Sequence, residues 1–135
     1  QGQFTSGTNS IAQRAGIAAL EGDMTAAREM KAAYKRRRDL VLELLKDVPG
    51  VKTYVPTGAF YLFPDVSDYF GKSDGETTIE DASDFCVYIL NEAHVSLVTG
   101  QAFGAPDCVR LSFAASDEQL KEAIRRIKEA LARLR

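Results

Sequence analysis

The sequence has little of the residues from which most metal and redox sites are built. It contains a single histidine, His94, and two cysteines, Cys86 and Cys108. The cysteines do not form a C-x-x-C pair, and no cluster of histidines accompanies them. These absences give no support to a zinc site or a dithiol redox motif. They favour a reducing, cytoplasmic setting, in which a chain of this kind needs no disulfide.

Long apolar runs and a basic excess are also missing. No segment approaches the roughly 18 to 20 apolar residues of a membrane span, and no secretory signal pattern is visible. The formal net charge is -2, whereas recognition of nucleic acid through a basic surface depends on clustered Lys and Arg. One basic run, YKRRRDL at 34–40, falls inside a helical pattern, and we expect a solvated face there rather than an anion-binding patch. A soluble protein without nucleic-acid or membrane partners follows.

Familiar catalytic motifs are absent as well. The sequence has no nucleophile elbow, no phosphate-binding glycine loop of standard pattern and no metal-ligand spacing. His94 ends a predicted helix, where a positive charge suits the helix dipole, so a structural role is favoured. The acidic residues Glu80, Asp81 and Asp84 lie in the first turn of the same helix, and the dipole explains them too.

What the sequence does contain is the pattern of a mixed helical and stranded domain. Its 135 residues, 45% of them hydrophobic, are enough for one globular core. Apolar periodicity predicts helices, alternation predicts strands, and a polar stretch predicts an exposed loop. The helices are expected at 10–21, 24–47, 80–93 and 117–134, a hairpin at 51–55 and 59–66, further strands at 95–98 and 108–114, and the loop at 67–77. TIED (78–81) and SDEQ (116–119) have capping-box spacing. The order predicts an α+β fold with a mostly antiparallel sheet, packed by helices on one face.

Two segments are more apolar than a free-standing domain requires. The strand at 59–63 places Ala59, Tyr61 and Phe63 on one face and Phe60 and Leu62 on the other, so both faces should be covered. Helices could cover both faces, or a partner surface could cover one. The helix at 10–21 is rich in small residues and is expected to pack closely against something.

An arginine stands in the middle of the strand at 108–114. Val109, Leu111 and Phe113 point to one side of this strand, and Arg110, Ser112 and Ala114 point to the other. The ordinary explanation is a solvated sheet face, since arginine is mostly exposed. A guanidinium on a rigid strand can also offer a carboxylate two parallel hydrogen bonds. Arg110 is therefore the candidate binding residue.

Four stretches resemble the C-terminal part of class I pyridoxal-phosphate-dependent aminotransferases of the aspartate aminotransferase family. They are TSGTNSIAQRAGIAAL (5–20), RRRDLVLELL (36–45), PTGAFYLFPDVS (56–67) and VSLVTGQAFGAPDCVRLSFAASDEQLKEAIRRI (95–127), which together cover essentially the whole chain. The resemblance implies the small domain of the fold type I transferases, with residues 23–135 as this domain. Residues 1–22 would face the missing large domain or a dimer partner, and PTGAFY would lie at the domain junction.

The resemblance also implies roles for particular residues. In that family the arginine of this strand binds the substrate α-carboxylate, and the matching residue is Arg110. Thr5 and Ser6 would contact the active site of a neighbouring subunit, although this chain has Ser6-Gly7-Thr8 where the family usually has S-N-P. The full-length enzyme would use pyridoxal 5'-phosphate, act on amino acid and 2-oxo acid substrates and form a homodimer.

The family's cofactor-binding groups precede the matched segment. No lysine here stands in the motif of the cofactor lysine, so the segment alone is expected neither to bind pyridoxal phosphate nor to transaminate. The chain starts at Gln1 rather than Met, which fits an engineered segment or one cut from a longer protein.

Two alternatives to the aminotransferase interpretation stay open. Arg110 could hold an anionic ligand in a stand-alone regulatory α+β module, or form a surface ion pair in a structural interaction domain.

Overall fold

The computed structural model describes Phe4 and residues 7–135. These residues form two compact units, divided between Ala32 and Ala33, and the division lies inside the long helix α3 (Thr25–Leu45). The expected division of the chain at residue 22 stays a prediction.

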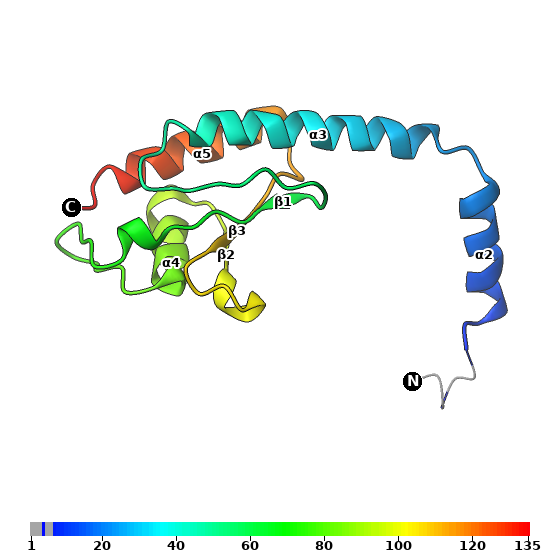
Figure 1. The fold of residues 1–135 in the computed structure, drawn as a ribbon, viewed down its shortest axis with the longest axis horizontal. Helices are drawn as coiled ribbons and strands as arrows, with labels where there is room; N and C mark the ends of the chain where they lie inside the picture. Colours follow the sequence, from blue (N-terminus) through cyan, green and yellow to red (C-terminus); the bar gives the residue numbers. More distant parts are fainter. Residues whose placement is uncertain (1–3, 5–6) are drawn as a thin grey trace. The chain divides into compact units, whose positions relative to one another are not determined.

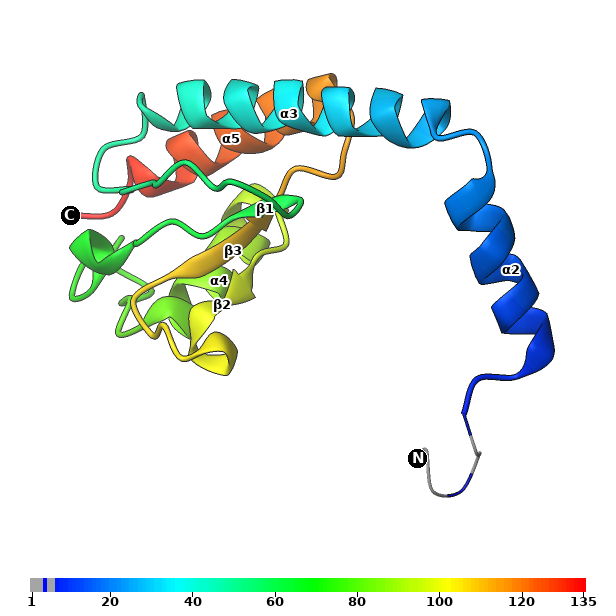
Figure 2. The same cartoon turned by 45° about the vertical axis from the view of Figure 1, so that its right-hand side comes forward.

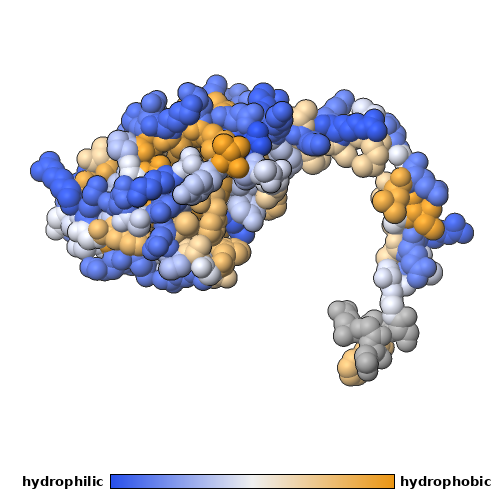
Figure 3. Space-filling model, in the orientation of Figure 1, coloured by the Kyte–Doolittle hydropathy of each residue, from blue (hydrophilic) through white to orange (hydrophobic). Residues whose placement is uncertain are grey.

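The first unit contains helix α2 (Ser10–Glu21), whose ends agree with the prediction. It begins where the Asn9 side chain accepts a hydrogen bond from the backbone N–H of Ala12 at 2.9 Å. It ends at Gly22, whose N–H donates to the carbonyl of Ala18. Every residue of α2 is exposed, and the space-filling view shows apolar residues uncovered along it (Figure 3).

The second unit is built on a three-stranded antiparallel sheet (Figure 1). Its strands are β1 (Tyr61–Leu62), β2 (Val98–Thr99) and β3 (Val109–Ser112), with β3 in the centre. In the register of β1 with β3, Tyr61 pairs with Ser112 and Leu62 with Leu111. Across β2, Val98 pairs with Arg110.

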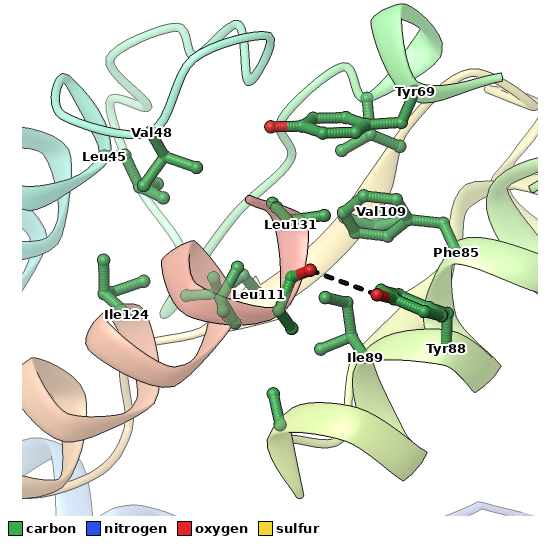
Figure 4. Packing of buried hydrophobic residues seen from close by; sticks show 14 of the residues in the cluster. Leu45, Val48, Tyr69, Phe85, Tyr88, Ile89, Val109, Leu111, Ile124 and Leu131 are labelled. Atoms are coloured by element: carbon green, nitrogen blue, oxygen red, sulfur yellow. Dashed lines mark hydrogen bonds between the residues drawn. The ribbon is translucent and has the colours of Figure 1, made fainter. Parts of the chain in front are cut away.

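Three helical segments of this unit enclose its core against the sheet. They are residues 33–45 of α3, helix α4 (Ala82–Ala93) and helix α5 (Asp117–Leu131). Both ribbon views show this part of α3 beside α5 (Figure 1, Figure 2). The Tyr88 hydroxyl of α4 donates to the carbonyl of Ala130 on α5 at 3.1 Å (Figure 4). The predicted α+β fold, with an antiparallel sheet packed by helices, is confirmed.

The alternation of β3 divides the sheet into an inner and an outer face. Val109, Leu111 and Phe113 are buried, Arg110 is partly buried and Ser112 is exposed. The inner residues join a single cluster whose members come from all three helical segments. Figure 4 labels Leu45, Val48, Tyr69, Phe85, Tyr88, Ile89, Val109, Leu111, Ile124 and Leu131 among them. The core therefore accounts for every second residue of β3 and leaves Arg110 outside it.

The expected hairpin is wrong in its extent. Residues 51–55 form no strand, and the segment pairs with 59–66 only at an isolated bridge between Lys52 and Asp65. The strand β1 pairs with β3 instead. Ala59 lies before β1 in the left-handed region, with φ 66°, a conformation that is uncommon for a residue other than glycine.

Two other expectations need correction. The turn-rich stretch 67–77 is not wholly exposed, because it contains the short helix η1 (Ser67–Tyr69) and buries Tyr69, whose hydroxyl donates to the carbonyl of Pro49. Helix α4 starts after Asp81 rather than at the TIED box, since the Asp81 carboxylate accepts the N–H groups of Ser83 and Asp84. An aspartate accepting two free N–H groups is a sufficient cap without the box.

The predicted capping box of α5 is confirmed, and it gives a testable stability effect. The Ser116 hydroxyl accepts the Gln119 N–H at 3.2 Å, and the Gln119 side chain accepts the Ser116 N–H at 3.1 Å. We expect Ser116→Ala to lower the free energy of unfolding by about 1 kcal/mol, because the backbone N–H of Gln119 loses the hydroxyl that accepts its hydrogen bond. Urea unfolding of the chain measures this change, with Ser116→Thr as the control that keeps the hydroxyl. Equal stability of the two variants would show that the box contributes nothing.

Candidate functional site

Arg110 occupies the centre of the outer sheet face. The pairing of Tyr61 with Ser112 places Tyr61, and two residues on Phe63, on the same face as Arg110. Leu62 points to the inner face and is buried, whereas Tyr61 and Phe63 are only partly covered. The doubly apolar strand thus has one face in the core and one face incompletely covered by the described residues.

Aromatic rings surround the guanidinium of Arg110. Its Cζ lies 5.6 Å from the ring centroid of Tyr61 and 5.3 Å from that of Phe103, over both rings. Phe103 in turn makes an edge contact with Phe63, with centroids 5.9 Å apart. Cation–π attraction acts through the ring faces. It holds the guanidinium without using any of its N–H donors.

Within the described part of the chain, no carboxylate lies at ion-pair distance from Arg110 and its guanidinium donates no hydrogen bond. Other arginines differ: Arg36 and Arg37 both contact Asp117, and the hydrogen bond from Arg36 lowers the pKa of that carboxyl group. Arg110 therefore presents a positioned cation with its hydrogen-bonding edge free, which is the chemistry of a carboxylate receptor.

A hollow of about 530 Å³ is lined in part by Tyr61, one of the two rings that contact Arg110. Its lining is Tyr54, Pro56, Thr57, Gly58, Ala59, Tyr61, Phe63 and Cys108. Most of these residues belong to the PTGAFY segment and the strand that follows it. The residues that line the hollow are mostly aromatic or apolar.

The ring of Phe103 reaches Arg110 from the short helix η2 (Gly100–Phe103), which follows β2. Gly100 is buried at its start, where an added Cβ would lie 2.2 Å from the carbonyl oxygen of Ala105. The side chain of Gln101 donates to the Asp81 carboxylate at 3.0 Å. Hydrogen bonds from the backbone of Asp84 and Ser83 lower the pKa of Asp81, so this acceptor is ionised at neutral pH.

The remaining candidates do not converge on Arg110. Thr5 and Ser6 lie outside the described residues. His94 is exposed and caps the C-terminal end of α4 in the left-handed conformation, with φ 54°. Burial raises the pKa of the Cys86 thiol to about 11, and it also raises the pKa of Cys108, so neither provides a thiolate.

The structure gives none of the lysines buried surroundings. None of the seven is buried, and the hydrogen bond from Lys52 to Asp68 raises the pKa of that amine instead of lowering it. Such chemistry needs an amine whose pKa is lowered by its surroundings. The described residues hold no group of potential metal ligands, and they include no helix long and apolar enough to cross a membrane.

Sequence reasoning identified Arg110 but missed its aromatic neighbours. Tyr61 could have been found, because strand register puts it beside Arg110. Phe103 gave no comparable signal, since it lies in a loop whose position depends on contacts with α4. In the basic run, expected as a solvated face, Arg36 is exposed and Arg37 and Arg38 are partly buried. Arg36 and Arg37 contact Asp117, and Arg38 contacts Asp39.

Comparison with known proteins places this chain in a family. Residues 1–127 match the family model described as aminotransferase class I and II. The aspartate aminotransferase of Pinus pinaster is 45% identical over all of this chain and 28% of its own length. The crystal structure of the Rhizobium meliloti aspartate aminotransferase superposes with a TM-score of 0.88 and 41% identity, covering 98% of this chain and 34% of that one.

The structural likeness extends beyond aspartate aminotransferases. The alanine aminotransferase of Pyrococcus furiosus superposes with a TM-score of 0.79 and 32% identity, over 92% of this chain and 30% of that one. This chain spans about a third of the length of the relatives it matches. The family match covers the first compact unit and the second as far as residue 127, including the strand that carries Arg110. The chain belongs to the class I and II aminotransferase family.

Proposed function

We propose that this chain is the C-terminal part of a pyridoxal-phosphate-dependent aminotransferase, in which Arg110 binds the α-carboxylate of the amino acid and 2-oxo acid substrates. The observation that supports this proposal is the set of neighbours around the guanidinium of Arg110. Its guanidinium is fixed over two rings and has no acidic partner among the described residues. A carboxylate would supply the missing acceptor, with two parallel hydrogen bonds to one planar fork.

One alternative, a surface ion pair, has less support from the same geometry. Arg36 and Arg37 show how surface arginines of this chain are neutralised, by sharing Asp117 at the start of α5. Arg110 has no such neighbour in the described part of the chain and lies on a rigid central strand. A strand fixes the direction of its side chains better than a loop does, as substrate orientation requires.

The names of the relatives support the substrate class. The match in Petunia hybrida is called a bifunctional aspartate aminotransferase and glutamate/aspartate-prephenate aminotransferase, at 43% identity. Aspartate, or a related amino acid, is accordingly the proposed amino donor and a 2-oxo acid the acceptor. A similar fold also occurs in a protein named as an alanine aminotransferase, whose name gives a different amino donor. The proposed role of Arg110 concerns the α-carboxylate, which all these substrates share.

The rest of the full-length protein would bind the cofactor. When bound, pyridoxal phosphate supplies the electron sink for removal of the substrate α-proton. None of the lysines of this chain is buried, so none has the surroundings that its attachment requires. Residues 23–135 would form the small domain, and its closure over the carboxylate would exclude water.

Residues 1–22 would face the large domain or a second subunit of a cytoplasmic homodimer. The support is the exposure of α2, where Ile11 is 81% and Leu20 is 86% exposed. A helix with apolar and small residues around most of its circumference is normally buried in an assembled protein. Thr5 and Ser6 precede this helix and are proposed to reach the neighbouring subunit's active site.

An assay that compares the two lengths of the protein tests the proposal. We expect the full-length protein with pyridoxal phosphate to transaminate aspartate with a 2-oxo acid, and the 135-residue chain to show neither turnover nor saturable cofactor absorbance. Coupled detection of the product 2-oxo acid and absorbance titration with the cofactor provide the measurements. Turnover by the 135-residue chain alone, traced to one modified lysine, would contradict the assignment.

A further inference from the structure

We infer that Phe103 is a positioning residue, which orients the guanidinium of Arg110 for the substrate carboxylate; the inference rests on the proposed role of Arg110. The centroid of the Phe103 ring lies 5.3 Å from Arg110 Cζ, slightly closer than the Tyr61 ring at 5.6 Å. The two rings come from different parts of the chain, β1 and η2. Together they restrict the guanidinium more than either ring would alone.

The exposure of Phe103 argues against a role in the core. Its side chain is 53% exposed, and it lies at the end of the polar loop segment GQAFG. Its ring contacts the ring of Phe63 and the guanidinium of Arg110, both at the outer sheet face. An apolar ring with so little burial stabilises the fold weakly, so its placement over a cation is the more specific feature.

The loop that carries Phe103 is itself fixed by specific contacts. Gly100 allows a close approach to the backbone of Cys108, whose carbonyl oxygen would lie 2.4 Å from an added Cβ. The Gly100 N–H donates to that same carbonyl at 2.8 Å. Gln101 bonds to Asp81, the cap of α4, at 3.0 Å. The ring is therefore presented to Arg110 from a loop anchored on both sides.

An aromatic partner suits this function better than an acidic one. A carboxylate beside Arg110 would neutralise it and occupy the donors needed by the substrate. A ring attracts the cation through its face and leaves the N–H edge free. Loss of the ring should then free the guanidinium to adopt other rotamers, so that the substrate carboxylate meets a less organised fork.

The test uses the full-length enzyme and a double-mutant cycle between Phe103 and Arg110. Phe103→Leu keeps an apolar side chain but removes the ring, and we expect KM for both the amino acid and the 2-oxo acid to rise about fivefold to tenfold. Phe103→Tyr keeps the ring and should stay within about twofold of the parent. In the Arg110→Ala background, Phe103→Leu should change KM no further, because nothing remains to be positioned.

The matched control is Leu90→Ala on α4, a side chain of similar exposure, 49%, that is not one of the two rings over Arg110. This control variant should leave KM unchanged. The thermal midpoint should also stay unchanged in every Phe103 variant. An equal effect of Phe103→Leu with and without Arg110 would overturn the inference. If Phe103→Leu kept the parental KM values while Arg110→Ala lost activity, the inference about Phe103 would be overturned and the proposed function would stand. Parental activity of Arg110→Ala would overturn both.

Discussion

Replacing Arg110 by alanine in the full-length enzyme is expected to lower kcat/KM for the amino acid and the 2-oxo acid alike by about 10² to 10⁴-fold. A substrate carboxylate left unpaired in a closed site loses roughly 3 to 5 kcal/mol, which corresponds to this range. Arg110→Lys should still lose much of the effect, because a point charge cannot reproduce two parallel donors. Steady-state kinetics with varied amino acid and varied 2-oxo acid measure both variants.

The same substitution should leave the fold nearly unchanged. Arg110 points away from the core, and none of its donors is used within the described residues. We expect its thermal midpoint to stay within about 2 °C of the parent, as for most surface substitutions. Arg126→Ala is the matched control, since it removes an arginine paired with Glu122 on the exposed side of α5. Activity of Arg110→Ala within about threefold of that control would make Arg110 a structural residue.

Phe113→Ala, unlike Arg110→Ala, should act mainly on stability, and we expect it to lower the free energy of unfolding more than any other variant described here. Phe113 directly follows β3, is 1% exposed and makes an edge contact with the ring of Tyr34 at 6.2 Å. Truncating a buried phenylalanine removes its transfer free energy and leaves a cavity, at a cost of about 3 to 5 kcal/mol. Phe113→Leu should lose less than half of this amount, because it fills most of the space.

Urea unfolding of the 135-residue chain checks this expectation. Far-ultraviolet circular dichroism is the suitable signal, because the chain contains no tryptophan. Ser112→Ala is the control from the outer face, where the side chain is exposed. If Phe113→Ala and Ser112→Ala had similar unfolding free energies, the assignment of inner and outer faces would be wrong, and with it the argument that Arg110 is free for binding.

The features predicted correctly from the sequence are those specified by nearby residues. The alternation of Val109, Arg110 and Leu111 assigned both faces of β3 without any tertiary information. The Ser116 and Gln119 pair located the start of α5 within one turn. Each pattern acts over a few residues, so the sequence alone could specify it.

The features that were missed depend on residues far apart in the chain. The 51–55 segment has the apolar content of a strand, but its backbone meets Asp65 only at Lys52. Tyr69 is buried in a turn-rich stretch because its hydroxyl reaches Pro49. Phe103 reaches Arg110 through a loop anchored to α4. Such placements follow from the assembled core, which local periodicity does not describe.

The most direct test of the central claim is a crystal structure of the full-length enzyme with a bound amino acid or a non-reactive analogue that retains the α-carboxylate. Binding by Arg110 predicts two nitrogens of its guanidinium at about 2.7 to 2.9 Å from the two carboxylate oxygens, with the rings of Phe103 and Tyr61 still beside it. An α-carboxylate bound by other residues, with Arg110 facing solvent or paired with an acidic side chain, would contradict the account.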